Sequence, residues 1–452
     1  MFSKILIANR GEIALRIIRT CQKLGIQTIA IYSEADADSV FVRQADESYC
    51  VGKPPVNQSY LNADEIIRIA KRGGAQAIHP GYGLLSENAA FAKKCIDEGI
   101  AFIGPSPEII ASMGSKIEAR KKIKEAGVPV IEGIDTSLDN EEEAIIAGKA
   151  VGYPLMLKAS AGGGGIGMQL VNSEEELRKA FAGNKKRAES FFGDGAMFLE
   201  KYISEPHHIE VQILADTYGN VIPLWERECS IQRRNQKVVE EAPSPFISEG
   251  TRKKMLEAAV KAAKHIGYFN AGTIEFLVDH EQNFYFLEMN TRLQVEHPIT
   301  EEITGLDLVE EQLKVAFGER LSLTRSDVHR KGHAIEVRIY AEDPITFFPS
   351  PGKITNFQLP QGEGIRNECA IEAGSQVTPF YDPMIGKLIA WGETRNEACI
   401  RIKKALENYK IEGIKTNISM LIQTVSHPQF LVGYTTTQFL SDYYLPQKTT
   451  AK

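Results

Sequence analysis

One stretch, residues 273–298, constrains the fold of this 452-residue chain more than any other. Two runs rich in aromatic and branched residues, Thr273–Asp279 and Phe284–Asn290, flank a polar turn of four residues. Such runs on either side of a short polar turn are typical of a β-hairpin. The stretch therefore predicts two antiparallel strands, and strand alternation then decides which side chains share a face.

Two glutamates face each other in this predicted hairpin. If the turn closes symmetrically, Asp279 faces Phe284, and counting back places Glu275 opposite Glu288. Carboxylates directly across an antiparallel pair repel each other, so a fold would normally avoid this arrangement. A hard cation bound between the two carboxylates turns this repulsion into a net attraction, and Asn290 on the same face adds a neutral oxygen ligand. These groups suit Mg²⁺ or Mn²⁺ held against a substrate phosphate, whereas zinc would require Cys or His.

Three further polar residues continue the stretch at every second position: Arg292, Gln294 and Glu296. If the chain stays extended, their side chains lie on the metal's side. One segment would then carry a cation site, a fixed positive charge, an amide and a candidate base. The alternative is a solvated edge strand with scattered charges. We favour the functional site because the neighbouring residues Phe284 and Phe286 have the pattern of a buried strand.

Composition excludes several functional classes. The formal net charge is −7, which gives no general electrostatic case for a nucleic-acid partner. We expect no membrane span, because no apolar run approaches the required length, and a cytoplasmic location, because no signal-like segment opens the chain. The cysteines lack any paired metal-binding spacing and indicate buried, reduced thiols: Cys21, Cys50, Cys95, Cys229, Cys369 and Cys399.

Strand and helix patterns alternate through residues 1–114. The expected elements are strand Lys4–Ala8, a helix to about Leu24, strand Gln27–Tyr32, helix Leu61–Lys71, strand Gln76–His79, helix Ser86–Glu98 and strand Ala101–Ile103. This alternation predicts a parallel sheet with helices on both faces. The turn after the first strand holds one glycine and lacks the dinucleotide fingerprint, so NAD binding is not expected. The loop His79–Gly83 is either a ligand loop or a plain turn.

A second unit, residues 115–330, contains a glycine-rich hairpin. The strand Tyr153–Lys158 runs into Gly162–Gly167, in which five of six residues are glycine, and the strand Met168–Val171 returns. Backbone amides without side chains around them can wrap phosphate oxygens, and a lysine ending the preceding strand strengthens this interpretation. We therefore expect residues 131–202 to form a mobile lid over a phosphate-containing ligand.

Three other stretches complete the chain. The basic residues from Lys116 to Lys124, including Arg120, are interpreted mainly as a solvated helix face. Residues 225–241 are unusually polar and form either a solvated loop or an ordered segment. The pattern of strands and helices changes in residues 331–446. A clean alternation over His333–Ala341 and a later strand and helix predict a C-terminal α+β domain.

Several motifs distributed along nearly the whole chain resemble one family. They are Ile7-Ala8-Asn9-Arg10-Gly11-Glu12-Ile13-Ala14, His79-Pro80-Gly81-Tyr82-Gly83, the Gly162–Gly167 loop, Glu241-Ala242-Pro243-Ser244-Pro245, Tyr381-Asp382-Pro383-Met384-Ile385 and the run from Glu288 to Pro298. Together they resemble the biotin carboxylases, the ATP-grasp subunits of acyl-CoA carboxylases. The resemblance implies an ATP-grasp fold, preceded by an N-terminal parallel-sheet domain and followed by a C-terminal domain, with a glycine-loop lid.

The resemblance also implies roles for individual residues. ATP would contact Lys116, Lys158, Gly164, Gly165, Glu200, Lys201, Tyr202, Ile203, His208, Gln232, Asn235, Glu275 and Glu288, with backbone groups of residues 200–203 at the purine edge. The metal would be held by Glu275, Glu288 and Asn290. Bicarbonate would be held by Lys237, Arg292, Gln294 and Val295, with Glu296 as its base. Arg338 would meet only the biotin enolate, so the catalytic residues would be Arg292, Glu296 and Arg338.

Two positions depart from the family pattern. Asn235 stands where many members have His beside the nucleotide, and Ile166 stands where many have Arg in the glycine loop. Neither change removes a catalytic group, so we expect at most an effect on nucleotide affinity.

The implied activity is the carboxylation of biotin from ATP and bicarbonate through carboxyphosphate, as the first half-reaction of acetyl-CoA carboxylase in fatty acid synthesis. Biotin would arrive on a separate carrier protein, since the sequence has no Met-Lys-Met biotinylation site, and carboxyltransferase subunits and a second copy of the chain are further expected partners. The alternatives are the same component of another acyl-CoA carboxylase, a different ATP-grasp ligase, or a non-catalytic nucleotide-binding regulatory protein.

Overall fold

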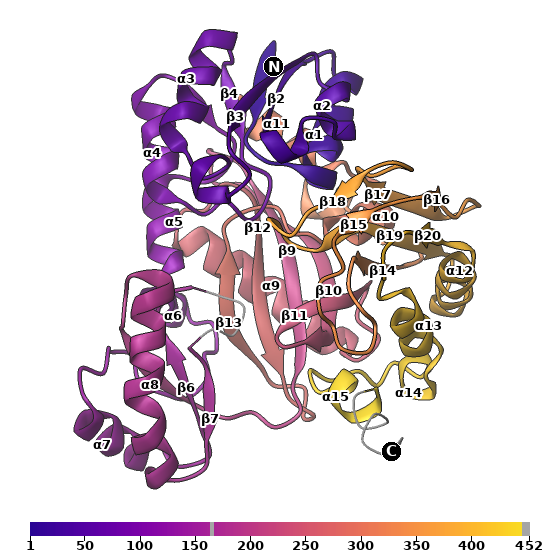
Figure 1. Ribbon diagram of the computed structural model, residues 1–452. Helices are drawn as coiled ribbons and strands as arrows, with labels where there is room; N and C mark the ends of the chain where they lie inside the picture. Colours follow the sequence, from indigo (N-terminus) through magenta and orange to yellow (C-terminus); the bar gives the residue numbers. More distant parts are fainter. Residues whose placement is uncertain (163–166, 445–452) are drawn as a thin grey trace.

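The computed structural model describes residues 1–162 and 167–444, and its N-terminal part is a five-stranded parallel sheet (Figure 1). The strand order is β3-β2-β1-β4-β5. Ile5 and Ile7 pack into one apolar core and Leu6 into another, so helices cover both faces, as predicted. The elements are β1 Lys4–Ile7, α1 Gly11–Lys23, β2 Gln27–Ser33, α2 Val40–Gln44, β3 Glu47–Gly52, α3 Ala63–Gly73, β4 Ala77–His79, α4 Ala89–Asp97, β5 Ala101–Phe102 and α5 Pro107–Gly114.

A small antiparallel sheet, in the order β7-β6-β8, has its own apolar core beneath two helices. Figure 1 shows this unit at the lower left, apart from the central sheet. The predicted glycine-rich hairpin is confirmed by the pairing of β6 with β7, although residues 163–166 at its tip, and with them Gly164, Gly165 and Ile166, lie outside the described residues. The elements are α6 Lys116–Glu125, α7 Glu141–Val151, β6 Leu155–Ala159, β7 Gln169–Val171, α8 Glu174–Phe192 and β8 Met197–Lys201.

The central sheet has eight strands in the order β13-β12-β9-β10-β11-β14-β19-β17 and does not stop at the boundary expected near residue 330. β11 pairs with β14, so the ATP-grasp part and the C-terminal part share one sheet. The elements are β9 His207–Ala215, β10 Val221–Arg233, β11 Gln236–Ala242, α9 Glu249–His265, β12 Asn270–Val278, β13 Phe284–Asn290, α10 His297–Thr304, α11 Leu308–Ala316, β14 His333–Tyr340, β17 Ile365–Cys369 and β19 Met384–Gly392.

Short elements complete the C-terminal part, which Figure 1 shows in orange and yellow at the right. They are β15 Gly352–Lys353, β16 Asn356–Gln358, β18 Gln376–Val377, α12 Arg395–Asn408, β20 Lys410–Glu412, α13 Ile418–Ser426, α14 Pro428–Leu431 and α15 Phe439–Tyr443. The helices α12 to α15 pack with β14 and β19 in one apolar core. No helix among the described residues is both long enough and apolar enough to cross a bilayer. All six cysteines are free, but Cys50 is exposed rather than buried.

The hairpin of β12 and β13 has the predicted pair Glu275 and Glu288, but for a different reason. Phe284 pairs with Val278, not with Asp279, so the turn closes one residue earlier than a symmetric count assumes. A register shift beside Glu275 then leaves Leu287 as the extra residue and restores the expected pairing. The symmetric turn was therefore wrong, and the β-bulge is what brings the two glutamates into opposition.

The polar residues 225–241 form a hairpin of long buried strands, β10 and β11, rather than a solvated loop. Its tip consists of Arg234 and Asn235, whose φ angles are 51° and 64°. Two successive positive φ angles are typical of a type I′ turn, and Asn adopts this conformation more readily than most residues. Asn235 therefore helps to form the turn through its backbone conformation.

Candidate active site

A cavity of about 860 Å³ lies where the N-terminal sheet, the small sheet and the central sheet meet. This volume is in the range of sites for nucleotide-sized ligands. Most of the residues implicated by the sequence line it: Lys116, Lys158, Lys201, Tyr202, Ile203, His208, Gln232, Asn235, Lys237, Glu275, Glu288, Asn290, Arg292, Gln294, Val295 and Arg338. Glu200 and Glu296 are buried just behind its wall.

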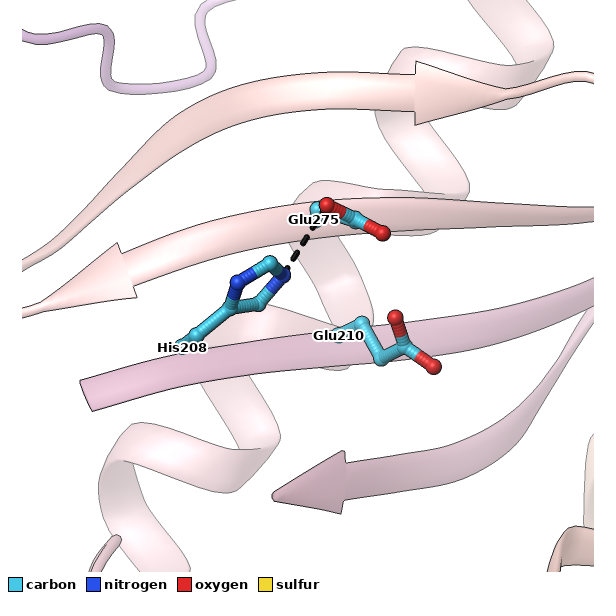
Figure 2. A group of neighbouring side chains, drawn as sticks. All are labelled: His208, Glu210 and Glu275. Atoms are coloured by element: carbon cyan, nitrogen blue, oxygen red, sulfur yellow. Dashed lines mark ion pairs between the residues drawn. The ribbon is translucent and has the colours of Figure 1, made fainter. Parts of the chain in front are cut away.

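Glu275 is the most heavily hydrogen-bonded carboxylate of the predicted metal set. It accepts from Lys237 Nζ at 2.7 Å, Asn290 Nδ2 at 2.9 Å and Gln294 Nε2 at 3.0 Å, and it pairs with His208 Nε2 at 2.9 Å. Figure 2 shows that pair, with Glu210 beside it on β9. Burial raises the pKa of Glu275, but Lys237 and His208 hold it well below its usual range.

The residues predicted to bind a metal fit a hard divalent cation. Glu288 lies opposite Glu275, lines the cavity and is partly exposed, with Lys116 Nζ 3.6 Å from its carboxylate. A second cluster, formed by His208, Glu210 and Glu275, suits such a cation less well, because Glu210 is already bonded to two buried cations and an imidazole is a poor ligand for Mg²⁺. Asn290 turns its Nδ2 to Glu275 and its Oδ1 to Arg292, so its amide would have to rotate to offer the oxygen to a metal beside Glu275.

Lys237 joins three buried carboxylates at the base of the cavity. Its Nζ lies 2.5 Å from Glu210, 2.7 Å from Glu275 and 2.7 Å from Glu296. Burial would lower the pKa of Lys237, but these three negative charges raise it well above the ordinary value. Arg227, which is fully buried, binds the other oxygen of Glu210 at 2.5 Å. The ammonium is therefore a permanent positive charge that faces any anion in the cavity.

Glu296 is fully buried between two cations. Lys237 Nζ donates to its Oε1 at 2.7 Å and Arg338 Nη2 donates to its Oε2 at 3.0 Å. Burial raises the pKa of Glu296, but Lys237 and then Arg338 hold it well below the usual range, so it is ionised at neutral pH. Arg338 also donates from Nε to Glu240 at 2.6 Å. That Arg338 meets only the biotin enolate among the reactants stays a prediction, but its guanidinium also contacts the candidate base directly.

Residues 292–296 are not a strand, because β13 ends at Asn290, yet Arg292 and Gln294 line the cavity as alternation predicted. Arg292 donates to Gln294 Oε1 at 2.6 Å and to Glu87 of the N-terminal part at 3.0 Å. Lys387 of β19 donates to the Val295 carbonyl at 2.6 Å. Sequence reasoning missed Glu87 and Lys387, because each is more than ninety residues from its partner in the chain.

The end of the cavity beside the small sheet holds a buried ion pair that the sequence did not indicate. Arg120 is only 2% exposed and donates to Glu200 at 2.5 Å, so it is not part of a solvated helix face. Lys158 pairs with the other oxygen of the same carboxylate. Glu200 therefore orients Lys158 with its side chain, while Lys201, Tyr202 and Ile203 line the cavity as expected. Gln232 Nε2 and His208 Nδ1 lie 2.8 Å apart.

Comparison with known proteins gives a consistent assignment. Residues 1–110 match the family of biotin carboxylase N-terminal domains, residues 115–324 the ATP-binding domain of the carbamoyl-phosphate synthase L chain, and residues 336–442 the biotin carboxylase C-terminal domains. A protein named biotin carboxylase from Halalkalibacterium halodurans is 65% identical over 443 residues, which are 98% of each chain. The chain belongs to the biotin carboxylase family. As a member it is an ATP-dependent ligase that carboxylates biotin, on an ATP-grasp fold with the predicted flanking parts.

Two other relatives are informative. A component of pyruvate carboxylase from Methanothermobacter thermautotrophicus is 52% identical over 98% of this chain and 90% of its own length. The biotin carboxylase domain dimer of a 2-oxoglutarate carboxylase from Hydrogenobacter thermophilus was solved in complex with MgADP, ADP and bicarbonate. It is 50% identical, covers 98% of both chains and superimposes with a TM-score of 0.96. The family thus includes components of enzymes that are named for different substrates of carboxylation.

Proposed function

We propose that this chain carboxylates biotin on a separate carrier protein, as the first half-reaction of acetyl-CoA carboxylase in fatty acid synthesis. The observation that carries the proposal is Glu296, a fully buried and ionised carboxylate held between Lys237 and Arg338 at the base of a nucleotide-sized cavity. A non-catalytic nucleotide-binding protein would have no use for this arrangement. The same component of another acyl-CoA or keto-acid carboxylase is the second candidate, favoured by the Methanothermobacter relative, which is named for pyruvate carboxylase.

ATP enters with its phosphates among fixed positive charges. Lys116 and Lys158 line the cavity on the nucleotide side, and the amides of Gly164 and Gly165 would complete the contacts. Residues 201–203 border the purine, with His208, Gln232 and Asn235 nearby. Mg²⁺ or Mn²⁺ at Glu275, Glu288 and Asn290 would offset the charge on the phosphates when bound. These side chains act by position and charge, without covalent chemistry.

Bicarbonate binds between Arg292 and Lys237. The guanidinium of Arg292 is always charged and presents two donors, while Gln294 and the backbone of Val295 close the other side. An anion placed here competes for Lys237 and Arg338, which weakens their hold on Glu296 and raises its pKa towards that of a useful base. Glu296 then takes the proton of bicarbonate, and the resulting oxyanion attacks the γ-phosphoryl group of ATP, which breaks the bond to ADP and gives carboxyphosphate and ADP.

Biotin reacts at the other end of the same site. Carboxyphosphate releases CO₂ and phosphate, the phosphate takes the ureido proton of biotin, and the deprotonated ureido nitrogen attacks CO₂ to give carboxybiotin. The enolate that forms needs a cation, and Arg338 is the guanidinium that lines the cavity on the C-terminal side. Water must be kept from hydrolysing carboxyphosphate, and we propose that residues 131–202 exclude it by closing as a lid.

The wider organisation follows from this mechanism. We propose an N-terminal domain of residues 1–114, an ATP-grasp domain of residues 115–330 and a C-terminal domain of residues 331–446. Biotin arrives on a carboxyl carrier protein and leaves to carboxyltransferase subunits, in the cytoplasm. A homodimer is supported by the dimer named for the Hydrogenobacter relative.

The test is ATP cleavage by the purified chain with free biotin. We expect turnover to require bicarbonate, biotin and Mg²⁺ or Mn²⁺ together, and turnover that ignores added biotin would contradict the carboxylase assignment. The acceptor is tested in the complex reconstituted with its native carrier and transferase. Acetyl-CoA should be carboxylated in preference to propionyl-CoA and pyruvate, whereas a preference for either of those would support the second candidate.

A further inference from the structure

Two buried glutamates behind Arg338 face each other across neighbouring strands. Glu240 belongs to β11 and Glu336 to β14, and the register of these antiparallel strands pairs them directly. Both residues are 0% exposed. Directly opposed residues have Cβ atoms about 5 Å apart and point to the same face. Two ionised carboxylates in this position, away from water, would repel each other strongly.

The two carboxyl groups differ in their partners. Arg338 Nε donates to Glu240 Oε1 at 2.6 Å. The remaining oxygen of Glu240 and both oxygens of Glu336 are buried and have no hydrogen-bond partner among the described residues. Buried polar atoms without partners are costly, and a single proton shared by the two groups would satisfy two of these three oxygens at once.

The charges that surround the pair do not supply a donor to Glu336. Lys387 of β19 lies opposite Arg338, but its ammonium contacts the Val295 carbonyl and, at 3.4 Å, Glu12. Burial raises the pKa of Glu336 well above its usual range although Lys387 lowers it, and burial raises the pKa of Glu240 only to about 7, because Arg338 limits the rise. The other titratable groups nearby are Lys237 at the start of β11, Glu296 before α10 and His297 in α10, whose pKa burial lowers well below its usual range.

We propose that Glu336 is a protonated acid at neutral pH that donates its hydrogen to Glu240, and that this acid–carboxylate pair positions Arg338. Glu240 then stays anionic and keeps its bond to Arg338 Nε. Glu336 touches neither substrate nor Arg338 and acts only through Glu240, so it is a positioning residue. The inference rests on the proposed role of Arg338 at the biotin end of the site.

The pair explains how Arg338 stays in place during the reaction. Its guanidinium bridges Glu296 and Glu240. When Glu296 takes a proton from bicarbonate, it becomes neutral and its attraction for Arg338 falls. Glu240 keeps its negative charge throughout, because the hydrogen bond that stabilises it comes from the proton held by Glu336. Arg338 therefore remains oriented when the biotin enolate forms.

Infrared spectroscopy on the whole chain tests the proton directly. The carbonyl stretch of a carboxylic acid is separate from that of a carboxylate, so wild type at about pH 8 should show a buried-acid band. Glu336→Gln should remove that band. Glu12→Gln is the matched control, since the pKa of this other buried carboxyl is also raised, to about 7, and its loss should leave the Glu336 band in place. A wild-type band that survives unchanged in Glu336→Gln overturns the proposal.

The pH dependence of stability gives a second test. A carboxyl whose folded pKa is raised stabilises the protein below its unfolded value of 4.5, and this stabilisation is lost as pH rises through the folded pKa. Glu336→Gln removes the titrating group, so its Tm relative to wild type should rise between about pH 6 and pH 9. A constant difference in Tm across that range would mean that Glu336 is ionised.

The conservative variant separates positioning from packing. Glu336→Leu removes the donor to Glu240 and should lower kcat/KM for free biotin about tenfold, the effect of losing one hydrogen bond to a charged group. Glu336→Gln keeps a neutral donor and should restore most of that loss. Equal impairment of the Gln and Leu variants would contradict the proposal. Biotin-dependent ATP cleavage by the wild type tests the proposed function without any variant. Failure of the proposed function can therefore be distinguished from failure of the proposal for Glu336.

Discussion

The central sheet and the two helices that cover the small sheet, α7 and α8, treat charge in opposite ways. In the central sheet, Arg227 and Glu210 are buried and ion-paired to each other, and Glu210 also pairs with Lys237, whose side chain is only 12% exposed. On the helices of the small sheet the ion pairs lie in solvent, as for Lys179 with Glu175, whose side chains are 73% and 77% exposed. Exposed pairs contribute little to stability, whereas buried charges must be paired to be tolerated. The difference fits the two roles we propose, a fixed catalytic base in the central sheet and a lid in residues 131–202.

The largest effect should come from the buried side of this comparison. Glu296→Ala removes the candidate base and leaves Lys237 and Arg338 without a shared partner. We expect both ATP cleavage and carboxybiotin formation to fall by roughly 1000-fold. The measurement is ADP and carboxybiotin from the same reaction. ATP cleavage at the wild-type rate would show that Glu296 does not act on bicarbonate.

Arg338→Gln should have the next largest effect. Losing a charge-assisted contact in a site without water typically lowers a rate about 100-fold or more, and we expect that fall in carboxybiotin. ATP cleavage should fall less, but it should fall, because Arg338 also holds Glu296. If the two products decline in a fixed ratio, Arg338 has no separate role at the biotin step.

A smaller effect is expected for Glu288→Gln. The substitution weakens the cation site, so turnover at a fixed Mg²⁺ concentration should fall about tenfold or more and should recover partly as the metal is increased. Glu288 is partly exposed and opposes another carboxylate, so folding should not suffer. A fall in the metal-free Tm of more than about 5 °C would mean that the residue is structural instead.

The smallest effect involves no change in sequence. Adding MgATP should slow hydrogen exchange in residues 131–202, because the small unit would close over the nucleotide, and should leave β9 and β12 of the central sheet unchanged. The control is the same experiment with MgCl₂ alone. Protection confined to the central sheet would contradict a lid.

Local rules predicted the parts of the site that are local in sequence. Counting back from the turn placed Glu275 opposite Glu288, although a bulge at Leu287 rather than a symmetric turn produces the pairing. Alternation also placed Arg292 and Gln294 towards the cavity, even though the chain there is not a strand. The periodic N-terminal part was predicted as a parallel sheet because each of its elements can be recognised separately.

Long-range pairs could not be predicted from the sequence. Arg120 looks like one of several surface lysines and arginines, and only the fold brings it to Glu200, eighty residues away. Glu240 and Glu336 are ninety-six positions apart and meet through the register of β11 and β14. Hydrophobic periodicity shows which face of a strand is buried but does not show its neighbour, so these buried charges look like ordinary surface residues.

The pairing of β11 with β14 has a consequence for dissecting this protein. A fragment that ended at residue 330 would leave β11 as an unprotected edge and would expose the apolar face that α12 to α15 cover. Such a fragment should aggregate instead of folding as an ATP-binding module. During synthesis, the central sheet stays incomplete until residues 384–392 have emerged, because β19 must pair with β14. The site at its centre therefore forms late, and exchange of C-terminal parts between relatives should succeed only when β11 and β14 are kept from the same parent.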